Sequence, residues 1–455
     1  MHLLAIHWGN VGIQILHLIL MLSILVILHE FGHYITARMF GCRVEKFYLF
    51  FDPWFSLFKK KIGDTEYGIG WLPLGGYVKI AGMIDESMDT EAMKQPAQPW
   101  EFRSKPAWQR LIIMLGGIIV NVLLAIILYA FVLFKWGEDK IPLASLKYGV
   151  DIQDSTLYKV GLRNGDKLLS IDGKEIDDLN TFRNQLLVGK NVQLIRNDQK
   201  MNIDLPVDFI GQLVENKIKR GFILPRIPVL VDSVSDTSKA FIAGLRKNDY
   251  IVAIDSQQMQ FFDELRPVLL AKKGQTILLT VNRNGQDISF QTPVSAEGTI
   301  GFTTVTDTKD MEKLGWLSVV HHNYGLLSSI PAGFKMTFSK LESYIDQFKL
   351  MLNRKTGAYK GMGGFKSMGK AMPVQFGDWQ YFWSITAFIS IILAFMNFLP
   401  IPALDGGHVL FTLYEMITGR KPHDKFLEYA QMAGMIILLA FMLFANGNDW
   451  FGWGK

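Results

Sequence analysis

The chain has 455 residues, of which 49% are hydrophobic and 20% are charged, and its mean hydropathy is +0.18. This composition is too apolar for an ordinary soluble protein and too charged for a protein that lies wholly in a membrane, so it predicts a membrane core with soluble inserts. The net charge of +5 is spread along the chain, and we therefore expect no nucleic acid partner. The single cysteine, Cys42, excludes an internal disulfide and argues against a cysteine-based zinc site.

Four segments are long and apolar enough to cross a lipid bilayer, for which about 20 residues suffice. They cover approximately residues 11–40, 111–134, 381–399 and 430–445. Lysine and arginine collect in the loops after the first and third segments, so the positive-inside rule places both termini and residues 135–380 outside the cytoplasm. The first segment lacks a basic leader, and we interpret it as a retained span. We therefore expect a polytopic α-helical protein with four transmembrane helices in a bacterial inner membrane.

A His-Glu-x-x-His motif, His29-Glu30-Phe31-Gly32-His33, lies at the end of the first apolar segment. On a helix its two histidines lie on one face, where both can bind one zinc ion, and Glu30 is placed to deprotonate a water molecule. Ionisable residues at membrane depth cost about 3 kcal/mol or more and are therefore interpreted as functional. The motif predicts a zinc-dependent hydrolase, and a solvated cluster at the helix end is the alternative.

A second acidic group follows the third apolar segment, in the sequence Asn-Phe-Leu-Pro-Ile-Pro-Ala-Leu-Asp-Gly-Gly at residues 397–407. A catalytic zinc site usually has three protein ligands, and the histidine motif supplies two. The first and third spans are predicted to run in the same direction, so Asp405 is expected near the depth of His29. His408 is a competing candidate ligand, and an ordinary helix-terminal turn is the alternative for Asp405.

Residues 67–80 combine glycine pairs and a proline with apolar and aromatic residues, which is typical of a β-hairpin. We expect this hairpin, over about residues 66–82, to dip into the membrane beside the active site. Non-helical backbone at that depth must be buried in protein or line a water-filled cavity. A hairpin at the membrane surface with no role in substrate binding is the alternative.

A Gly-Leu-Arg turn that leads into an alternating strand occurs twice, at residues 161–173 and 244–255, with an offset of 83 residues. Each copy resembles a PDZ domain in its permuted bacterial form, which would bind peptide C-termini by strand addition. Spacer modules with blocked grooves are the alternative. The predicted order is an N-terminal membrane part (1–134), two PDZ-like domains (135–225 and 226–308), an interfacial helical linker (309–380) and a C-terminal membrane part (381–455).

The two polar motifs together resemble the paired signatures of the site-2 protease family of intramembrane zinc metalloproteases. The tandem PDZ-like insert is similar to the bacterial, RseP-like branch of that family. The resemblance implies a Zn²⁺ cofactor, with His29, His33 and Asp405 as the metal ligands and Glu30 as the catalytic base.

The resemblance also implies a set of residues that contact the substrate. Asn397, Pro400 and Pro402 would shape the substrate cleft, and Gly68 and Gly70 would belong to a membrane-reentrant β-hairpin. The implied substrates are single-pass membrane proteins, cut within their transmembrane segment after their extracytoplasmic part has been trimmed. Anti-sigma factors and remnant signal peptides are examples of such substrates.

The second span departs from the family pattern, because Gly117 stands where relatives usually have proline, and the resemblance assigns no role to Asn121. Two other functions stay open at this point. One is a non-catalytic zinc-containing membrane scaffold that displays PDZ domains. The other is a transporter, although the four spans show none of the inverted repeats that transporters normally have.

Overall fold

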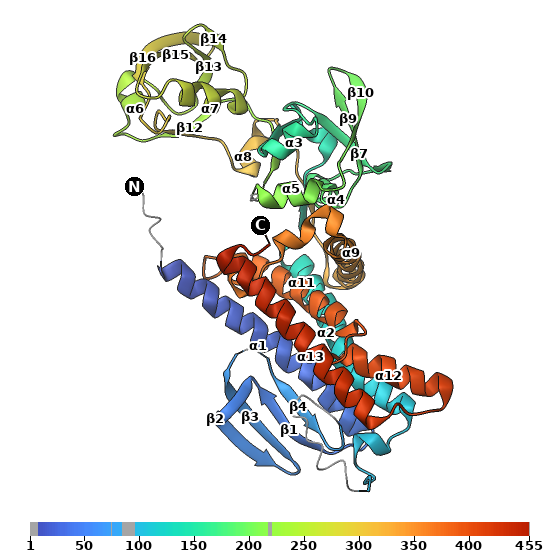
Figure 1. Ribbon diagram of the computed structural model, residues 1–455. Helices are drawn as coiled ribbons and strands as arrows, with labels where there is room; N and C mark the ends of the chain where they lie inside the picture. The colour runs from blue at the N-terminus through green and yellow to red at the C-terminus, as the bar shows by residue number, and fades with distance from the viewer. Residues whose placement is uncertain (1–7, 74, 84–95, 217–220, 455) are drawn as a thin grey trace. The chain divides into compact units, whose positions relative to one another are not determined.

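The computed structural model describes residues 8–73, 75–83, 96–216 and 221–454, so Leu74 of the predicted hairpin lies outside the described residues. The chain forms two compact units, whose elements are labelled in Figure 1. The membrane unit comprises Met1–Gly137, Asn323–Phe348 and Met362–Lys455. The inserted unit comprises Glu138–His322 and Lys349–Gly361.

Four helices of the membrane unit are long and apolar enough to cross a membrane, which confirms the predicted polytopic α-helical fold. They are α1 (Trp8–Met39), α2 (Ala107–Trp136), α11 (Trp379–Phe398) and α13 (Asp424–Phe451). Shorter or less apolar helical elements connect them. These are η2 (Phe102–Ser104), α9 (Leu326–Leu352), α10 (Phe365–Ala371) and α12 (Asp405–Thr418).

Glycines allow α1 and α2 to cross with their backbones in contact. A Cβ atom on Gly32 of α1 would lie 2.3 Å from the carbonyl oxygen of Gly116 on α2, and one on Gly116 would lie 2.5 Å from the Gly32 carbonyl oxygen. Small residues permit such close helix packing in membranes, where burial of apolar surface gives little driving force between helices. The crossing places the backbone of α2 directly against the histidine motif of α1.

Helix α9, which the sequence predicts as part of an interfacial linker, packs against α2 and α11. A Cβ atom on Gly333 would lie 2.6 Å from the backbone nitrogen of Ala130, so the α9–α2 contact also depends on a glycine. Three turns further along α9, the ring of Tyr344 meets Phe388 and Phe395 of α11 edge-on. The polar residues of α9 therefore accompany a face that is buried against two of the spanning helices.

A four-stranded sheet lies beside α1 and has the strand order β2-β3-β1-β4 (Figure 1). Its strands are β1 (Val44–Leu49), β2 (Phe51–Ile62), β3 (Thr65–Leu72) and β4 (Tyr77–Ile80). Strand β3 pairs with β2 on one side and with β1 on the other, whereas β4 pairs only with β1 among the described strands. The structure therefore differs from the predicted hairpin at 66–82, because β1 lies between its two halves and leaves β4 at an edge.

The inserted unit contains two modules with the same sheet topology, each with its own hydrophobic core. Their four-stranded sheets have the orders β10-β9-β7-β8 and β16-β15-β13-β14, and each module adds a two-stranded sheet, β11-β6 or β17-β12. The structure confirms the predicted β-rich inserts in a membrane protein. The PDZ assignment and the predicted domain limits stay predictions, and Trp316 and Leu317, placed in the linker, pack in the first core.

The elements of the inserted unit follow in chain order. The first module, with its flanking elements, comprises β5 (Glu138–Lys140), η3 (Leu143–Ser145), β6 (Val150–Ile152), α3 (Ser155–Lys159), β7 (Lys167–Ile171), β8 (Lys174–Glu175), α4 (Leu179–Leu186), β9 (Asn191–Arg196), β10 (Gln199–Asp204), α5 (Phe209–Glu215) and β11 (Ile223–Pro225). The second module comprises β12 (Val231–Val234), α6 (Lys239–Ala243), β13 (Tyr250–Ile254), β14 (Gln257–Gln258), α7 (Phe262–Ala271), β15 (Thr276–Arg283), β16 (Gln286–Pro293) and β17 (Phe302–Thr304). After it come α8 (Thr308–Lys313), β18 (Val320–His322), η4 (Arg354–Thr356) and η5 (Ala358–Gly361).

Candidate metal centre and active site

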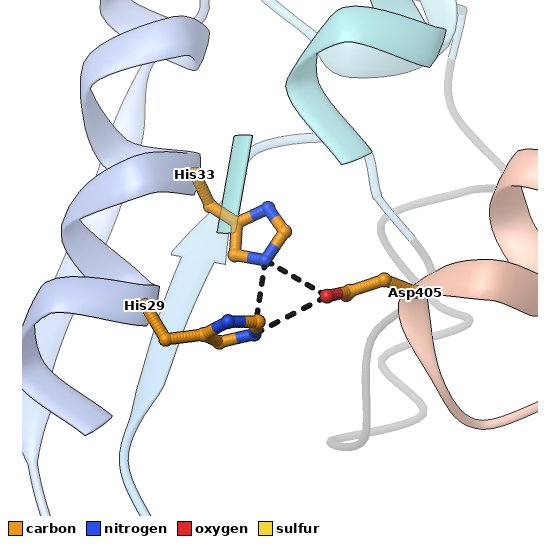
Figure 2. Close-up of side chains that lie close together, drawn as sticks. All are labelled: His29, His33 and Asp405. Atoms are coloured by element: carbon orange, nitrogen blue, oxygen red, sulfur yellow. Dashed lines mark hydrogen bonds and ion pairs between the residues drawn. The ribbon is translucent and has the colours of Figure 1, made fainter. Parts of the chain in front are cut away.

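Three side chains from two distant parts of the chain converge in the membrane unit. The Oδ2 atom of Asp405 lies 3.2 Å from Nε2 of His29 and 3.2 Å from Nε2 of His33. The two Nε2 atoms are 3.4 Å apart. Figure 2 shows both imidazoles on one face of α1, directed at the carboxylate, although Asp405 is 372 residues away from His33 in the chain.

The donor atoms fit a zinc ion in number, type and spacing. Two imidazole nitrogens and one carboxylate oxygen are a ligand set that catalytic zinc sites use. Tetrahedral zinc with bonds of about 2.0–2.1 Å separates two ligand atoms by about 3.3 Å, which is close to the three distances between the donor atoms. Among the described residues, His29, His33 and Asp405 form the cluster that could hold a metal ion.

The backbone of α2 orients His33. Its Nδ1 atom lies 2.9 Å from the carbonyl oxygen of Ile113, so Nδ1 carries the proton and donates it to that carbonyl. The proton on Nδ1 leaves Nε2 as the lone-pair donor that a metal requires. A Cβ atom on Gly117 would lie 2.4 Å from Nε2 of His33, so this position has no room for a side chain. The glycine that departs from the family pattern therefore provides space for the two histidines of the candidate metal site.

A sharp break after α11 positions Asp405 in the first turn of α12, a helix that the sequence did not predict. The chain leaves α11 at Phe398 and turns back through Ala403, whose φ angle is +78°. A Cβ atom on Gly406 would lie 2.1 Å from the carbonyl oxygen of Leu399, so only a glycine admits this turn. The Asp-Gly-Gly sequence thus places an acid at a helix start that lies directly against the end of α11.

Next to the three candidate ligands is a cavity of 640 Å³, and the side chain of Glu30 lines it. The Glu30 side chain lies beside the start of β4, because a Cβ atom on Gly76 would lie 3.6 Å from its Cγ atom. Residues Gly75 to Ile80, which include all of β4, line the same cavity. An acidic group, a sheet edge and a candidate metal site therefore share one chamber within the membrane unit.

The predicted substrate-binding residues do not all line the cavity. Asn397 lines the cavity, and its Nδ2 atom lies 3.3 Å from Nε2 of His29. Pro400 and Pro402 lie in the turn between α11 and α12, outside the cavity lining, and the Pro402 carbonyl abuts Gly434 of α13. Gly68 and Gly70 lie in β3, also outside the lining. Their lack of a side chain makes room for the ring of Tyr48 and for the backbone of Phe51.

Three further polar side chains belong to this region. His408, the predicted competitor of Asp405, lines the cavity, as does Gln431 from α13. Asn121 of α2 places its Nδ2 atom 3.1 Å from Nδ1 of His29. The sequence analysis gave Gln431 and Asn121 no role, although a lone amide side chain in an apolar span is a signal that could have identified both.

Comparison with known proteins agrees with this geometry. The model of peptidase family M50 matches residues 17–441 of the chain. The regulator of sigma-E protease RseP of Escherichia coli is 28% identical, in an alignment that covers 95% of this chain and 97% of the relative. The regulator of sigma E protease of Haemophilus influenzae is 27% identical over 95% of this chain and 97% of its own length. A protein of Neisseria meningitidis with zinc metalloprotease in its name is 26% identical, with coverage of 96% and 98%.

Because the family model extends over nearly the whole chain, from the first span to the last, this chain belongs to peptidase family M50 and is an RseP-like zinc metalloprotease.

Proposed function

We propose that the chain is an intramembrane protease that hydrolyses a peptide bond within the transmembrane segment of single-pass membrane proteins, after their extracytoplasmic part has been trimmed. One observation carries the proposal. A single carboxylate oxygen of Asp405 lies equally close to both histidines of the motif, and Glu30 faces the same cavity. A structural zinc site in a scaffold protein needs neither an acidic neighbour nor a cavity beside the metal.

His29, His33 and Asp405 would hold the zinc ion in this protease. When bound, zinc supplies a Lewis acid that polarises a carbonyl group and lowers the pKa of a water molecule to about 7. Glu30 takes a proton from the water as it attacks the scissile carbonyl, and then gives that proton to the nitrogen of the leaving amine as the C–N bond breaks. Asn397, whose amide lies beside His29, is placed to donate a hydrogen bond to a substrate backbone carbonyl.

We propose that the substrate chain binds along the edge strand β4. A transmembrane helix hides its carbonyls in internal hydrogen bonds, and each bond that is opened in an apolar environment costs several kcal/mol unless it is replaced. The outer edge of β4 pairs with no strand among the described residues and lines the cavity. Glu30 and Val78 line this cavity together, and a Cβ atom on Gly76, next to β4, would lie 3.6 Å from Cγ of Glu30. A substrate segment added to β4 as a strand would thus lie directly beside the catalytic glutamate.

The proposed orientation follows from the distribution of positive charge. Both termini and the β-rich modules lie outside the cytoplasm of a bacterial cell, and the metal site lies toward the cytoplasmic face of the inner membrane. In this arrangement the two modules lie on the same side of the membrane as a substrate's extracytoplasmic chain. Their proposed role is to exclude untrimmed substrates and to bind the free peptide C-termini of trimmed ones.

The variant Glu30→Gln tests the proposal, because it keeps the shape of the side chain and removes the base. In proteoliposomes that contain a trimmed single-pass substrate, we expect cleavage to fall by at least about 100-fold. The zinc content of the purified protein should equal that of wild type. The same substitution at the exposed Glu342 of α9 is the matched control and should leave cleavage unchanged. Normal turnover in Glu30→Gln would refute the proposed role.

A further inference from the structure

Asn121 is a fully buried amide that lies against a metal-binding histidine and has one unsatisfied atom. Its side chain is 0% exposed, and its Nδ2 atom lies 3.1 Å from Nδ1 of His29. Its Oδ1 atom is buried and has no hydrogen-bond partner within the described part of the chain. The backbone carbonyl of Asn121 accepts a hydrogen bond of 2.8 Å from the hydroxyl of Ser390, which holds this turn of α2 against α11.

The position of the proton on His29 determines which atom of Asn121, Oδ1 or Nδ2, should face its Nδ1 atom. Nε2 of His29 faces Asp405 and His33, so it is the nitrogen that would bind zinc. A neutral imidazole that binds metal through Nε2 carries its proton on Nδ1, and that proton requires an acceptor. For His33 the acceptor is the Ile113 carbonyl. For His29 the polar side chain at Nδ1 is Asn121, and an NH₂ group cannot accept a proton.

A half-turn of the amide plane resolves this conflict. The oxygen and nitrogen of a carboxamide have nearly the same shape, so the group can be placed either way round in one site. With the amide turned, Oδ1 takes the position 3.1 Å from Nδ1 of His29 that Nδ2 otherwise has. Either orientation leaves one end of the amide without a partner among the described residues, so the tautomer of His29 decides between them.

We infer that Asn121 is a positioning residue whose Oδ1 accepts the Nδ1 proton of His29 and so holds this imidazole in the tautomer that presents Nε2 to zinc. The inference rests on the proposed metal site. The Asn121 side chain would accept the Nδ1 proton of His29, as the Ile113 carbonyl of the same helix accepts the Nδ1 proton of His33. The glycine-lined crossing of α1 and α2 brings both acceptors within reach of the motif.

Two substitutions at Asn121 test whether Nδ1 of His29 needs a hydrogen-bond acceptor at this position. Asn121→Asp keeps an acceptor of the same shape and removes the NH₂ group, whereas Asn121→Leu has a similar volume and offers no polar atom. The zinc affinity of the full-length protein in detergent is measured by competition with a chelator, with metal content read by atomic spectrometry. Loss of an outer hydrogen bond of this kind typically weakens metal binding by about 10- to 100-fold. We expect that loss for Asn121→Leu, and affinity within about threefold of wild type for Asn121→Asp.

A structural role for Asn121 would give a different pattern. Ser390→Ala is the matched control, because it removes the other hydrogen bond at this turn and leaves the contact with His29; we expect its zinc affinity to match wild type. Folding is followed with a thiol-reactive dye, since the only cysteine, Cys42, is buried and becomes reactive on unfolding. Equal loss of zinc in both Asn121 variants, or full retention in Asn121→Leu, would overturn the inference. Wild-type protein without zinc affinity would instead refute the metal site itself.

Discussion

The two β-rich modules of the inserted unit share one turn in atomic detail. In the first module the carboxylate of Asp166 accepts hydrogen bonds from the backbone N–H of Arg163 and from the guanidinium of Arg196. In the second, Asp249 accepts the same bonds from Arg246 and Arg283, at the same distances within 0.1 Å. The repeated Gly-Leu-Arg sequence therefore reflects a structural requirement, since the buried aspartate connects the turn to a neighbouring strand.

The modules differ where a peptide would bind. In the first module Arg183 on α4 donates a hydrogen bond of 2.7 Å from its Nε atom to the carbonyl oxygen of Ile223 on β11. Arg266 is the residue at the repeat offset on α7 of the second module, and it is exposed. The two copies therefore keep the same scaffold but differ in the contact of this arginine.

The largest expected effect tests the shared turn. Asp166→Ala leaves the guanidinium of Arg196 without its carboxylate partner, and removal of one member of a buried ion pair costs about 3–5 kcal/mol. We expect a destabilisation near the lower end for Asp166→Ala and a slightly smaller one for Asp249→Ala, because the side chain of Arg283 is 32% exposed and that of Arg196 is 25% exposed. Hydrogen exchange of β7, β9, β13 and β15 measures each module separately.

The control for these variants is Asp236→Ala, at an exposed aspartate of the second module, which should leave exchange unchanged. If each variant weakened both modules equally, the two modules would unfold as one cooperative unit. The effects of the two aspartates on their own modules could then not be told apart by hydrogen exchange.

The second prediction concerns low pH, and it distinguishes strands β6 and β12, which precede the shared turn in each module. Burial, together with repulsion from the Asp263 carboxylate, raises the pKa of Asp151 to about 6, against the opposing effects of Gln153 and Arg226. The equivalent residue of the second module is Asp232, which is half-exposed and bonds Lys247. The equivalence follows from the preceding valines, because each donates its N–H to the carbonyl of its module's buried aspartate.

The sign of the pH dependence follows from the folded pKa of Asp151, which lies above the value of about 3.9 in an unfolded chain. The folded state binds the Asp151 proton more tightly than the unfolded state does. The contribution of Asp151 to the stability of the first module is therefore greatest below about pH 4, falls by about 3 kcal/mol as the pH rises to 6, and is then constant. Asp151→Asn should abolish this slope and stabilise the first module at pH 7. Hydrogen exchange between pH 4 and pH 7 measures it, and a slope that persists in Asp151→Asn would assign the effect to another group. Asp232→Asn should leave the slope intact.

Much of the architecture could be predicted because its signals are local. Apolar runs of sufficient length gave the four spanning helices, and the spacing of the histidine motif placed His29 and His33 on one face of α1. The repeat at 161–173 and 244–255 predicted two similar modules, which the matching sheet orders bear out. Each of these signals depends on residues that are neighbours in sequence.

The features that the sequence did not predict depend on contacts between distant segments. Strand β1 inserts between β3 and β4, and no local pattern at 66–82 indicates that pairing. Helix α12 begins at Asp405, where proline and glycine suggested only a turn, because Gly406 can approach the end of α11. Asn121 and the buried His17 of α1 are single polar residues in apolar spans, and their partners, His29 and the Pro373 carbonyl, became visible only after folding.

The smallest expected effect tests whether Arg183 hinders the addition of a peptide strand to β11. Strand β11 pairs only with β6 among the described strands, so its other edge is where a peptide strand would be added, and Arg183 occupies a carbonyl of that edge. A hydrogen bond from a charged donor contributes about 1.5–3 kcal/mol, so Arg183→Ala should strengthen peptide binding at β11 by at least about tenfold. The probe is a fluorescein-labelled peptide with a free C-terminal valine, followed by anisotropy with the full-length protein in detergent. Protection of β11 from hydrogen exchange identifies the binding site.

Arg266→Ala is the matched control, because it removes the equivalent side chain without freeing a carbonyl at β11, and it should leave binding there unchanged. Equal affinity at β11 for wild type and Arg183→Ala would mean that the hydrogen bond from Arg183 to Ile223 does not weaken peptide binding. The two grooves would then be equally open, and the divergence between the modules would lie elsewhere. A gain confined to Arg183→Ala would instead identify the first module as one that its own side chain keeps closed, and would leave peptide recognition to the second module.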